Sequence, residues 1–198
     1  IDYAPGWPRI ENVTADIRFS ANRMEVRSSS ASILGAQLAR VQAVIPDLTH
    51  HYEQLQVTGE AEGPTAEFMR FIDASPVGAK IERFTEGMEA QGRGRLTLKL
   101  TLPLREMAKS RVAGSYQFIA NRLRVDSDLP PLEQVEGRLD FTEASVQGQN
   151  IAAQLFGGPA SIAVSTQGGA VAVKASGRAS IDALRRTIQH PFVRGLSG

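Results

Sequence analysis

Apolar and polar residues alternate with a period of two along most of this 198-residue chain. In residues 95–102, Leu96, Leu98, Leu100 and Leu102 alternate with arginine, threonine and lysine. Successive side chains of a β-strand point to opposite faces, so this pattern predicts strands with one apolar face. The same pattern marks residues 13–19, 24–26, 41–45, 55–59, 112–118, 123–125, 135–141, 162–164 and 170–175. The sequence therefore predicts a mostly-β protein, a curved antiparallel sheet of about ten to twelve strands.

Turn and helix signals divide these strands. Residues 21–22 and 120–121 are predicted to form tight turns, and residues 28–30 a loop or the tip of an edge strand. Thr65 is expected to cap a first short helix after Pro64. Two more short helices are expected, one over residues 77–88 and one beginning at Ser180. The predicted sheet thus carries a few short α-helices at the junctions between groups of strands.

An internal repeat organises the chain. Residues 7–20 align without gaps with residues 129–142, an offset of 122 (129 − 7). Shorter matches join residues 34–35 to 156–157 at the same offset, and residues 57–61 to 175–179 at an offset of 118 (175 − 57). We therefore predict two units, residues 1–88 and 89–198, each with strands followed by helix. Both belong to one continuous repeat array cut from a larger protein.

The amino-acid composition excludes several kinds of site and of binding partner. Lysine and arginine number 22 and aspartate and glutamate 21, so the formal charge of +1 supplies no general attraction to nucleic acid. The absence of cysteine excludes a disulfide scaffold, a thiolate zinc site and a cysteine nucleophile. No apolar run approaches the ~18 residues that a membrane-spanning helix needs. Because the chain begins at Ile1 rather than methionine, we expect it to be a segment of a longer protein.

The residues that suit metals or catalysis do not form a familiar site. Asp47, His50, His51 and Glu53 lie close in sequence, but adjacent histidines of a strand point to opposite faces. Their spacing matches no common zinc motif, and a polar hairpin loop explains them better. The chain also lacks the G-x-S-x-G pattern of serine hydrolases. We predict no metal, no cofactor, no catalytic residues and no enzymatic activity.

The surplus of apolar strand faces is the main functional signal. In an ordinary sandwich each such face packs on another sheet; alternatively, a curved sheet leaves its concave face open as an apolar groove for acyl chains. An aromatic content of 6% and a few short helices favour the groove, because little bulky material is available to fill it. The candidate groove-lining residues are Ile17, Phe19, Leu96, Leu98, Leu100, Leu102, Val112, Tyr116, Phe118, Val135, Leu139 and Phe141.

Several segments together resemble the YhdP branch of the AsmA-like family. They are residues 3–8, the strand 13–19, residues 102–104, residues 114–118, residues 129–141 and residues 156–159. The resemblance spans nearly the whole chain in the family's order, through structural motifs rather than catalytic signatures. It implies a long β-sheet groove resembling bridge-like lipid-transfer proteins of the Gram-negative envelope. The family offers no catalytic residues to carry over.

The resemblance implies a function and a location. The segment would belong to the periplasmic part of a protein anchored in the inner membrane, with the anchor outside this chain. Its partners would be phospholipid or another acyl-chain ligand, the neighbouring repeats and envelope proteins. The alternative is a non-catalytic structural or interaction module in outer-membrane assembly, without a lipid conduit. A weaker third option, a carbohydrate-binding β domain, lacks an evident aromatic platform.

Overall fold

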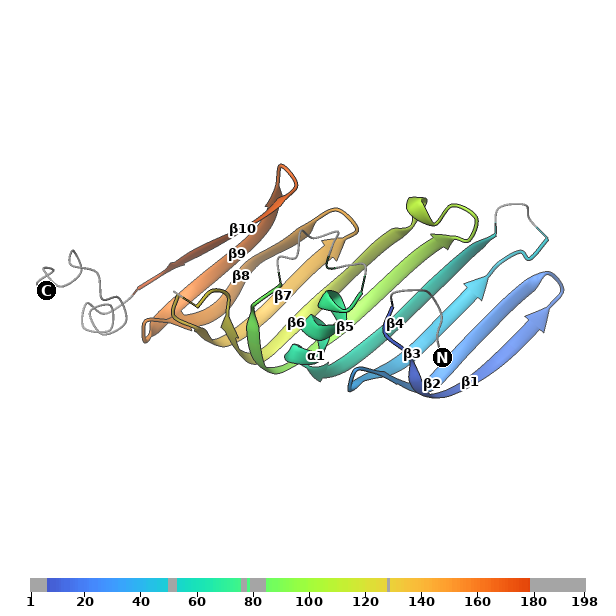
Figure 1. Cartoon of the computed structure of the whole chain (residues 1–198), viewed down its shortest axis with the longest axis horizontal. Coiled ribbons are helices and arrows are strands. Elements are labelled where there is room, and N and C mark those ends of the chain that lie inside the picture. Colours follow the sequence, from blue (N-terminus) through green and yellow to red (C-terminus); the bar gives the residue numbers. More distant parts are fainter. Residues whose placement is uncertain (1–6, 50–52, 76–77, 79–84, 128, 179–198) are drawn as a thin grey trace, which may run out of the picture.

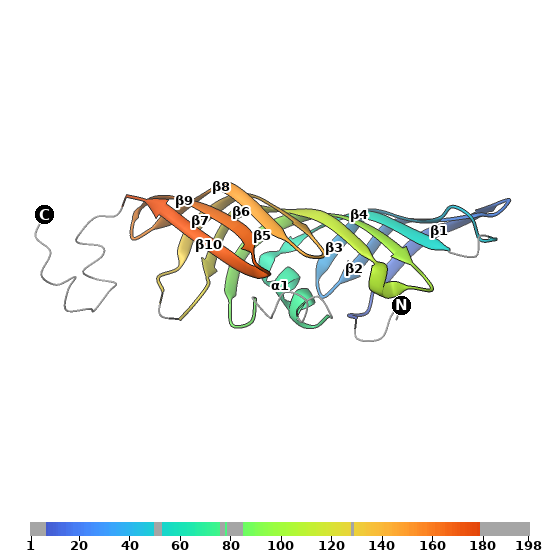
Figure 2. The ribbon, with the colours of Figure 1, turned by 90° about the horizontal axis from the view of Figure 1, so that it is seen from above.

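The structure, a computed structural model, describes residues 7–49, 53–75, 78, 85–127 and 129–178. In this part of the chain ten strands form one open sheet, each antiparallel to the next along the chain (Figure 1). The elements are β1 (Glu11–Ser20), β2 (Arg23–Ile33), β3 (Ala36–Ile45), β4 (Gln54–Pro64), α1 (Thr65–Asp73), β5 (Glu89–Pro103), the 3₁₀ turn η1 (Met107–Lys109), β6 (Arg111–Arg124), β7 (Leu132–Thr142), β8 (Val146–Leu155), β9 (Gly158–Gln167) and β10 (Ala170–Gly177). The predicted mostly-β, curved antiparallel sheet is confirmed, and Figure 2 shows α1 on one side of it.

Tight turns keep strands that are neighbours in sequence side by side. Leu34 and Gly35, between β2 and β3, have φ angles of 47° and 87°. Phe156 and Gly157, between β8 and β9, repeat this conformation with 52° and 72°. Positive φ at both central residues is typical of type I′ turns, whose twist matches that of the flanking strands. Residues at the same repeat offset therefore build the same kind of hairpin.

The hairpins β1–β2 and β7–β8 are built alike. Asn12 (φ 53°) and Gln134 (φ 51°) occupy the same position in the repeat, and each lies at a bulge in its strand. The pairs around the bulge are Glu11 with Ser32 and Thr14 with Ser30 in the first hairpin, and Glu133 with Gln154 and Glu136 with Ala152 in the second. All four pairs keep the offset of 122, so β7 is the structural counterpart of β1. The division into units at residue 88 stays a prediction.

Two predicted interruptions are wrong. Residues 120–121 do not turn the chain, because β6 continues through them with a bulge at Ala120 (φ 49°). The Asn121 amide satisfies the disturbed backbone by donating to the carbonyl oxygens of Arg93 (2.7 Å) and Ile119 (3.1 Å). Residues 28–30 lie inside β2 instead of in a loop. Asparagine and serine are enriched in turns because their side chains bond to backbone, and in β6 asparagine does so inside a strand.

The predicted first helix is confirmed as α1, but its capping differs. The N-cap residue is Pro64, and Thr65 is the first helical residue. The Thr65 hydroxyl is buried and bonds to side chains of β6, so it is not free to cap the helix. The two helices predicted over residues 77–88 and after Ser180 fall largely outside the described residues.

Candidate functional site

Strand pairing places the apolar positions of the sheet on one face. Residues directly opposite each other in an antiparallel pair share a face. An unbroken series of opposed residues runs across β1 to β6: Ile17, Val26, Ala43, Val57, Leu100 and Val112. A second series runs across β4 to β8: Gly59, Leu98, Gly114, Phe141 and Val146. The apolar face is therefore continuous from strand to strand.

The opposite face of the same strands is polar and charged. Arg95, Thr97 and Lys99 alternate with the leucines of β5 and are exposed. Arg95 lies 3.2 Å from a carboxylate oxygen of Glu62 on β4, and other ion pairs on this face join Arg40 to Glu60 and Arg138 to Asp140. These exposed pairs contribute little to stability, on the order of 0–1 kcal/mol each. The two faces of the sheet thus have contrasting chemistry.

Helix α1 covers one part of the apolar face. Phe68 of the helix forms a buried cluster with Ala36, Ala61 and Tyr116, against which Leu96 and Phe118 also pack. The ring centroids of Phe68 and Tyr116 are 5.2 Å apart at 72°, and those of Tyr116 and Phe118 are 4.9 Å apart at 74°. Such edge-to-face pairs stabilise a packed cluster beyond the area that they bury.

A buried chain of hydrogen bonds fixes α1 to β6. The Tyr116 hydroxyl donates to Oγ1 of Thr65 at 2.9 Å, and the Thr65 hydroxyl in turn donates to the side-chain oxygen of Asn121. Asn121 is fully buried, so this interaction has no competition from water. Burial raises the pKa of Tyr116 to about 12, because the phenolate would be poorly solvated there, although the hydrogen bond with Thr65 acts in the opposite direction.

Two glycines make room for the aromatic residues of the apolar face. A Cβ at Gly94 would collide with the hydroxyl of Tyr116, and a Cβ at Gly114 would lie 2.5 Å from Cζ of Phe141. Any larger residue at either position would displace the ring that crosses it. Glycine inside a strand weakens it, and here its role is the close approach of a ring to the backbone.

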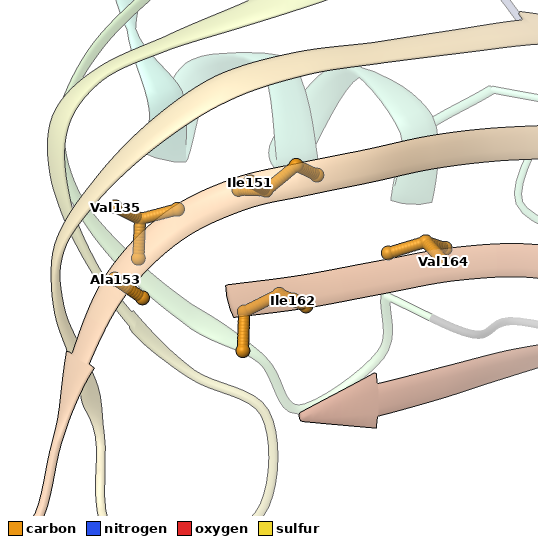
Figure 3. Packing of buried hydrophobic residues seen from close by; sticks show 5 residues of the cluster. All are labelled: Val135, Ile151, Ala153, Ile162 and Val164. Atoms are coloured by element: carbon orange, nitrogen blue, oxygen red, sulfur yellow. The ribbon is translucent and has the colours of Figure 1, made fainter. Parts of the chain in front are cut away.

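A second buried cluster lies where β7, β8 and β9 bend. Its members are Val135, Ile151, Ala153, Ile162 and Val164. Figure 3 shows these side chains gathered across the three strands, with Val135 and Ala153 at the bend and Val164 farther along β9. Phe118 and Leu139 pack against the cluster from the neighbouring strands. We call the part of the apolar face formed by this cluster and the one beneath α1 the covered region.

Outside these two clusters the apolar residues of this face are mostly half-buried or exposed, with Ile45, opposite Met24 and 7% exposed, as an exception. We call the following half-buried and exposed residues the open row: Ile17, Phe19, Met24, Val26, Ala43, Leu55, Val57, Leu98, Leu100, Leu102, Val112 and Phe141. Most of these side chains are half-buried, and Ile17 and Phe19, on the edge strand, are 64% and 66% exposed. With strands about 4.8 Å apart, a row across β1 to β7 is about 29 Å long.

The twelve sequence-predicted residues divide between these two regions. All lie on the apolar face, seven of them in the open row: Ile17, Phe19, Leu98, Leu100, Leu102, Val112 and Phe141. The other five pack in the covered region: Leu96, Tyr116, Phe118, Val135 and Leu139. Sequence reasoning missed Met24, Val26, Ala43, Leu55 and Val57 as members of the row, although their alternation had marked them as strand residues.

The described residues offer apolar contact surface rather than reactive groups. They hold no group of three or more potential metal ligands. Two pockets among them measure about 330 Å³, beside Glu53 and Arg105, and about 450 Å³, beside Trp7 and Leu34. In the same residues no helix is long and apolar enough to cross a membrane. The open row suits a ligand whose surface is apolar and extended.

The chain forms an open antiparallel sheet with one apolar and one charged face, and its match to a family model assigns it to the AsmA-like proteins. The family model described as YhdP protein matches residues 1–198, and the chain belongs to that family, as the resemblance predicted. A curated relative, the intermembrane phospholipid transporter YhdP of Escherichia coli (strain K12), is 22% identical over 171 residues. The match covers 86% of this chain but only 13% of the relative's length. No solved structure matches the chain.

Proposed function

We propose that the open row carries the acyl chains of phospholipids, and that this chain is a non-catalytic segment of a bridge between the inner and outer membranes. The observation that carries the proposal is the unbroken series of opposed apolar residues across the sheet, which no other described element covers. Each methylene that leaves water for such a surface contributes about 0.8 kcal/mol. The relative that acts as an intermembrane phospholipid transporter supports the same ligand.

The form of the row favours movement of lipid over storage. Its members are aliphatic or aromatic, and charged side chains of the same strands lie on the other face. An acyl chain that slides along such a row exchanges one set of apolar contacts for a similar set. The free energy therefore changes little from strand to strand, which is what a conduit requires.

The proposed location follows from the family. A relative that works between membranes supports a segment in the periplasm, and an anchor in the inner membrane would lie elsewhere in the larger protein. Neighbouring repeats and envelope proteins remain the proposed further partners. The alternative, a structural module in outer-membrane assembly without a conduit, requires another element to fill the open row.

A pair of variants on adjacent residues of β5 tests the proposal. Leu98→Asp introduces a carboxylate into the open row, whereas Thr97→Asp introduces the same group on the charged face. After purification from a membrane-containing extract, native mass spectrometry should detect phospholipid on the wild-type chain and on Thr97→Asp, and little on Leu98→Asp. Circular dichroism and thermal unfolding establish that both variants fold.

Three results would contradict the proposal. The wild-type chain could retain no phospholipid, or Thr97→Asp and Leu98→Asp could retain it equally. If instead Leu98→Asp unfolded while Thr97→Asp did not, Leu98 would belong to a closed core, as the structural-module alternative requires.

A further inference from the structure

The outer edge of β1 combines an unpaired strand backbone with exposed apolar side chains. β1 is the first strand of the sheet, and none of the described residues pairs with its outer side. Ile17 and Phe19 on this strand are mostly exposed, whereas their repeat counterparts Leu139 and Phe141 are half-buried. An exposed strand edge with large apolar residues is a template for pairing with another strand.

The repeat identifies which kind of strand fits this edge. β7 is the counterpart of β1, with the same bulge and the same register toward the following strand. On its other side β7 pairs with β6, where Tyr116 lies opposite Leu139 and Gly114 opposite Phe141. The offset of 122 places Ile17 at the position of Leu139 and Phe19 at the position of Phe141.

We infer that the outer edge of β1 docks an antiparallel strand with the pattern of β6, contributed by another repeat unit of the same kind. In this register a large aromatic residue lies opposite Ile17 and a glycine lies opposite Phe19. The glycine is required because a Cβ at Gly114 would come within 2.5 Å of Cζ of the equivalent ring, that of Phe141. Docking buries Ile17 and Phe19 to the level of their counterparts and extends the open row by one strand.

The charged face is compatible with the same register. Asp16 and Arg18 alternate with Ile17 on β1 and occupy the positions of Arg138 and Asp140 on β7. The latter two lie opposite the neutral residues Gln117 and Ser115 of β6. A β6-like strand therefore presents neutral polar groups to Asp16 and Arg18, and no like charges meet.

A fusion that reproduces the β6–β7 connection tests the inference. A second copy of residues 89–122 is placed directly before Ile1, because residue 123 and Ile1 are equivalent at the offset of 122. One cysteine then replaces Ile17 of the original chain, and a second replaces Tyr116 of the added copy. The chain has no other cysteine. Directly opposed residues have Cα atoms about 4.5–5.5 Å apart, within the range that a disulfide spans.

The inference predicts a disulfide that depends on register. The matched pair should oxidise readily, whereas a pair slipped by two residues, with Phe19→Cys in place of Ile17→Cys, should not. Gly114→Val in the added copy should abolish the matched disulfide by its collision with Phe19. Amide hydrogen exchange in β1 should also slow when the added strand is docked.

Equal oxidation of the matched and slipped pairs, or no effect of Gly114→Val, would overturn the inference. Should the fusion fail to fold, a synthetic peptide of residues 111–122 with Tyr116→Cys, added to the full chain carrying Ile17→Cys, reads the same register. Preferential crosslinking of this peptide to Val173→Cys on the opposite edge would also overturn the inference. All readings are made without lipid, so they are independent of the proposed lipid binding.

Discussion

The covered region and the open row lie on the same face of the same sheet, yet they differ in surroundings. On β6, Tyr116 is buried beneath α1, whereas Val112, four residues earlier on the same face, is half-buried. The strands of the covered region and of the open row have the same alternation and the same apolar character. Beneath α1, the covering helix and not the pattern of the strand decides whether such a residue stabilises the fold or is available to a ligand.

The covered region and the open row also differ in their types of residue. The covered region beneath α1 uses shape-specific aromatic pairs, such as Phe68 with Tyr116, and a hydrogen-bonded asparagine. The open row of β5 uses leucines, which belong to neither buried cluster. A mobile acyl chain needs a smooth apolar surface rather than a fixed complement, so we attribute the leucines of β5 to the proposed ligand.

The largest expected contrast comes from truncating one buried and one half-buried side chain. Ile151→Ala should lower the free energy of unfolding by about 2–5 kcal/mol, because Ile151 is 2% exposed and a cavity would remain. Leu98→Ala should cost less, about 1 kcal/mol, because solvent already reaches Leu98. Urea unfolding of both variants measures the difference. Equal losses would mean that the open row is part of a closed core.

Alkaline pH should weaken the covered region through Tyr116. Below pH 10 the tyrosine is protonated in both states and contributes no pH dependence. Above it, the unfolded chain loses the proton first, because burial holds the native pKa at about 12. Stability should therefore fall by up to about 1.4 kcal/mol per pH unit between pH 10 and 12.

The Tyr116→Phe variant isolates this effect. It removes the titrating group while the other tyrosines, lysines and arginines still titrate. The difference in unfolding free energy between the wild-type chain and Tyr116→Phe should shrink steadily from pH 10 to pH 12. A difference that stays constant with pH would show that Tyr116 is not buried as described.

Thr65→Val should have a smaller effect on the attachment of α1. The variant keeps the shape of the side chain but leaves the Tyr116 hydroxyl and the Asn121 oxygen without their shared partner. A loss of about 1–3 kcal/mol is expected from buried groups left unpaired. Thr97→Val, on the exposed charged face, is the matched control. Thermal unfolding should show that its stability is nearly that of the wild-type chain.

The smallest effect is expected on the charged face. Arg95→Gln removes an exposed ion pair with Glu62, and the free energy of unfolding should change by less than about 0.5 kcal/mol. Retention of phospholipid, measured by native mass spectrometry, should not change either. A loss of lipid from Arg95→Gln would mean that the charged face takes part in binding.

The sequence predicted the positions of the strands better than it predicted which parts of their apolar face are buried. Alternation over residues 95–102 and 135–141 was sufficient because the side-chain period of a strand is two, whatever surrounds it. β8 was missed because its alternation is interrupted around Gly148 and at Asn150, which has φ 54°. The local turn signal at Asn121 was overridden by a hydrogen bond to the backbone of Arg93, 28 residues away in the sequence, which no local pattern reveals.

The sequence predicted which residues share the apolar face, but not the division of that face into the covered region and the open row. Leu98 and Tyr116 have the same alternation signal in sequence, and only the packing of α1 separates them. The helix itself was predicted, but which strands it covers depends on tertiary contacts. The space for the rings of Tyr116 and Phe141 likewise depends on Gly94 and Gly114 from neighbouring strands, so it could not be found without the pairing register.

The central claim is that phospholipid occupies the open row, and a crosslinking scan along β5 tests it most directly. A photoreactive residue is placed in turn at each position from 96 to 101 in chain purified with phospholipid. We expect crosslinked lipid from positions 98 and 100, less from position 96 near α1, and little from positions 97, 99 and 101. Equal crosslinking from both faces of the strand, or none from positions 98 and 100, would contradict the account.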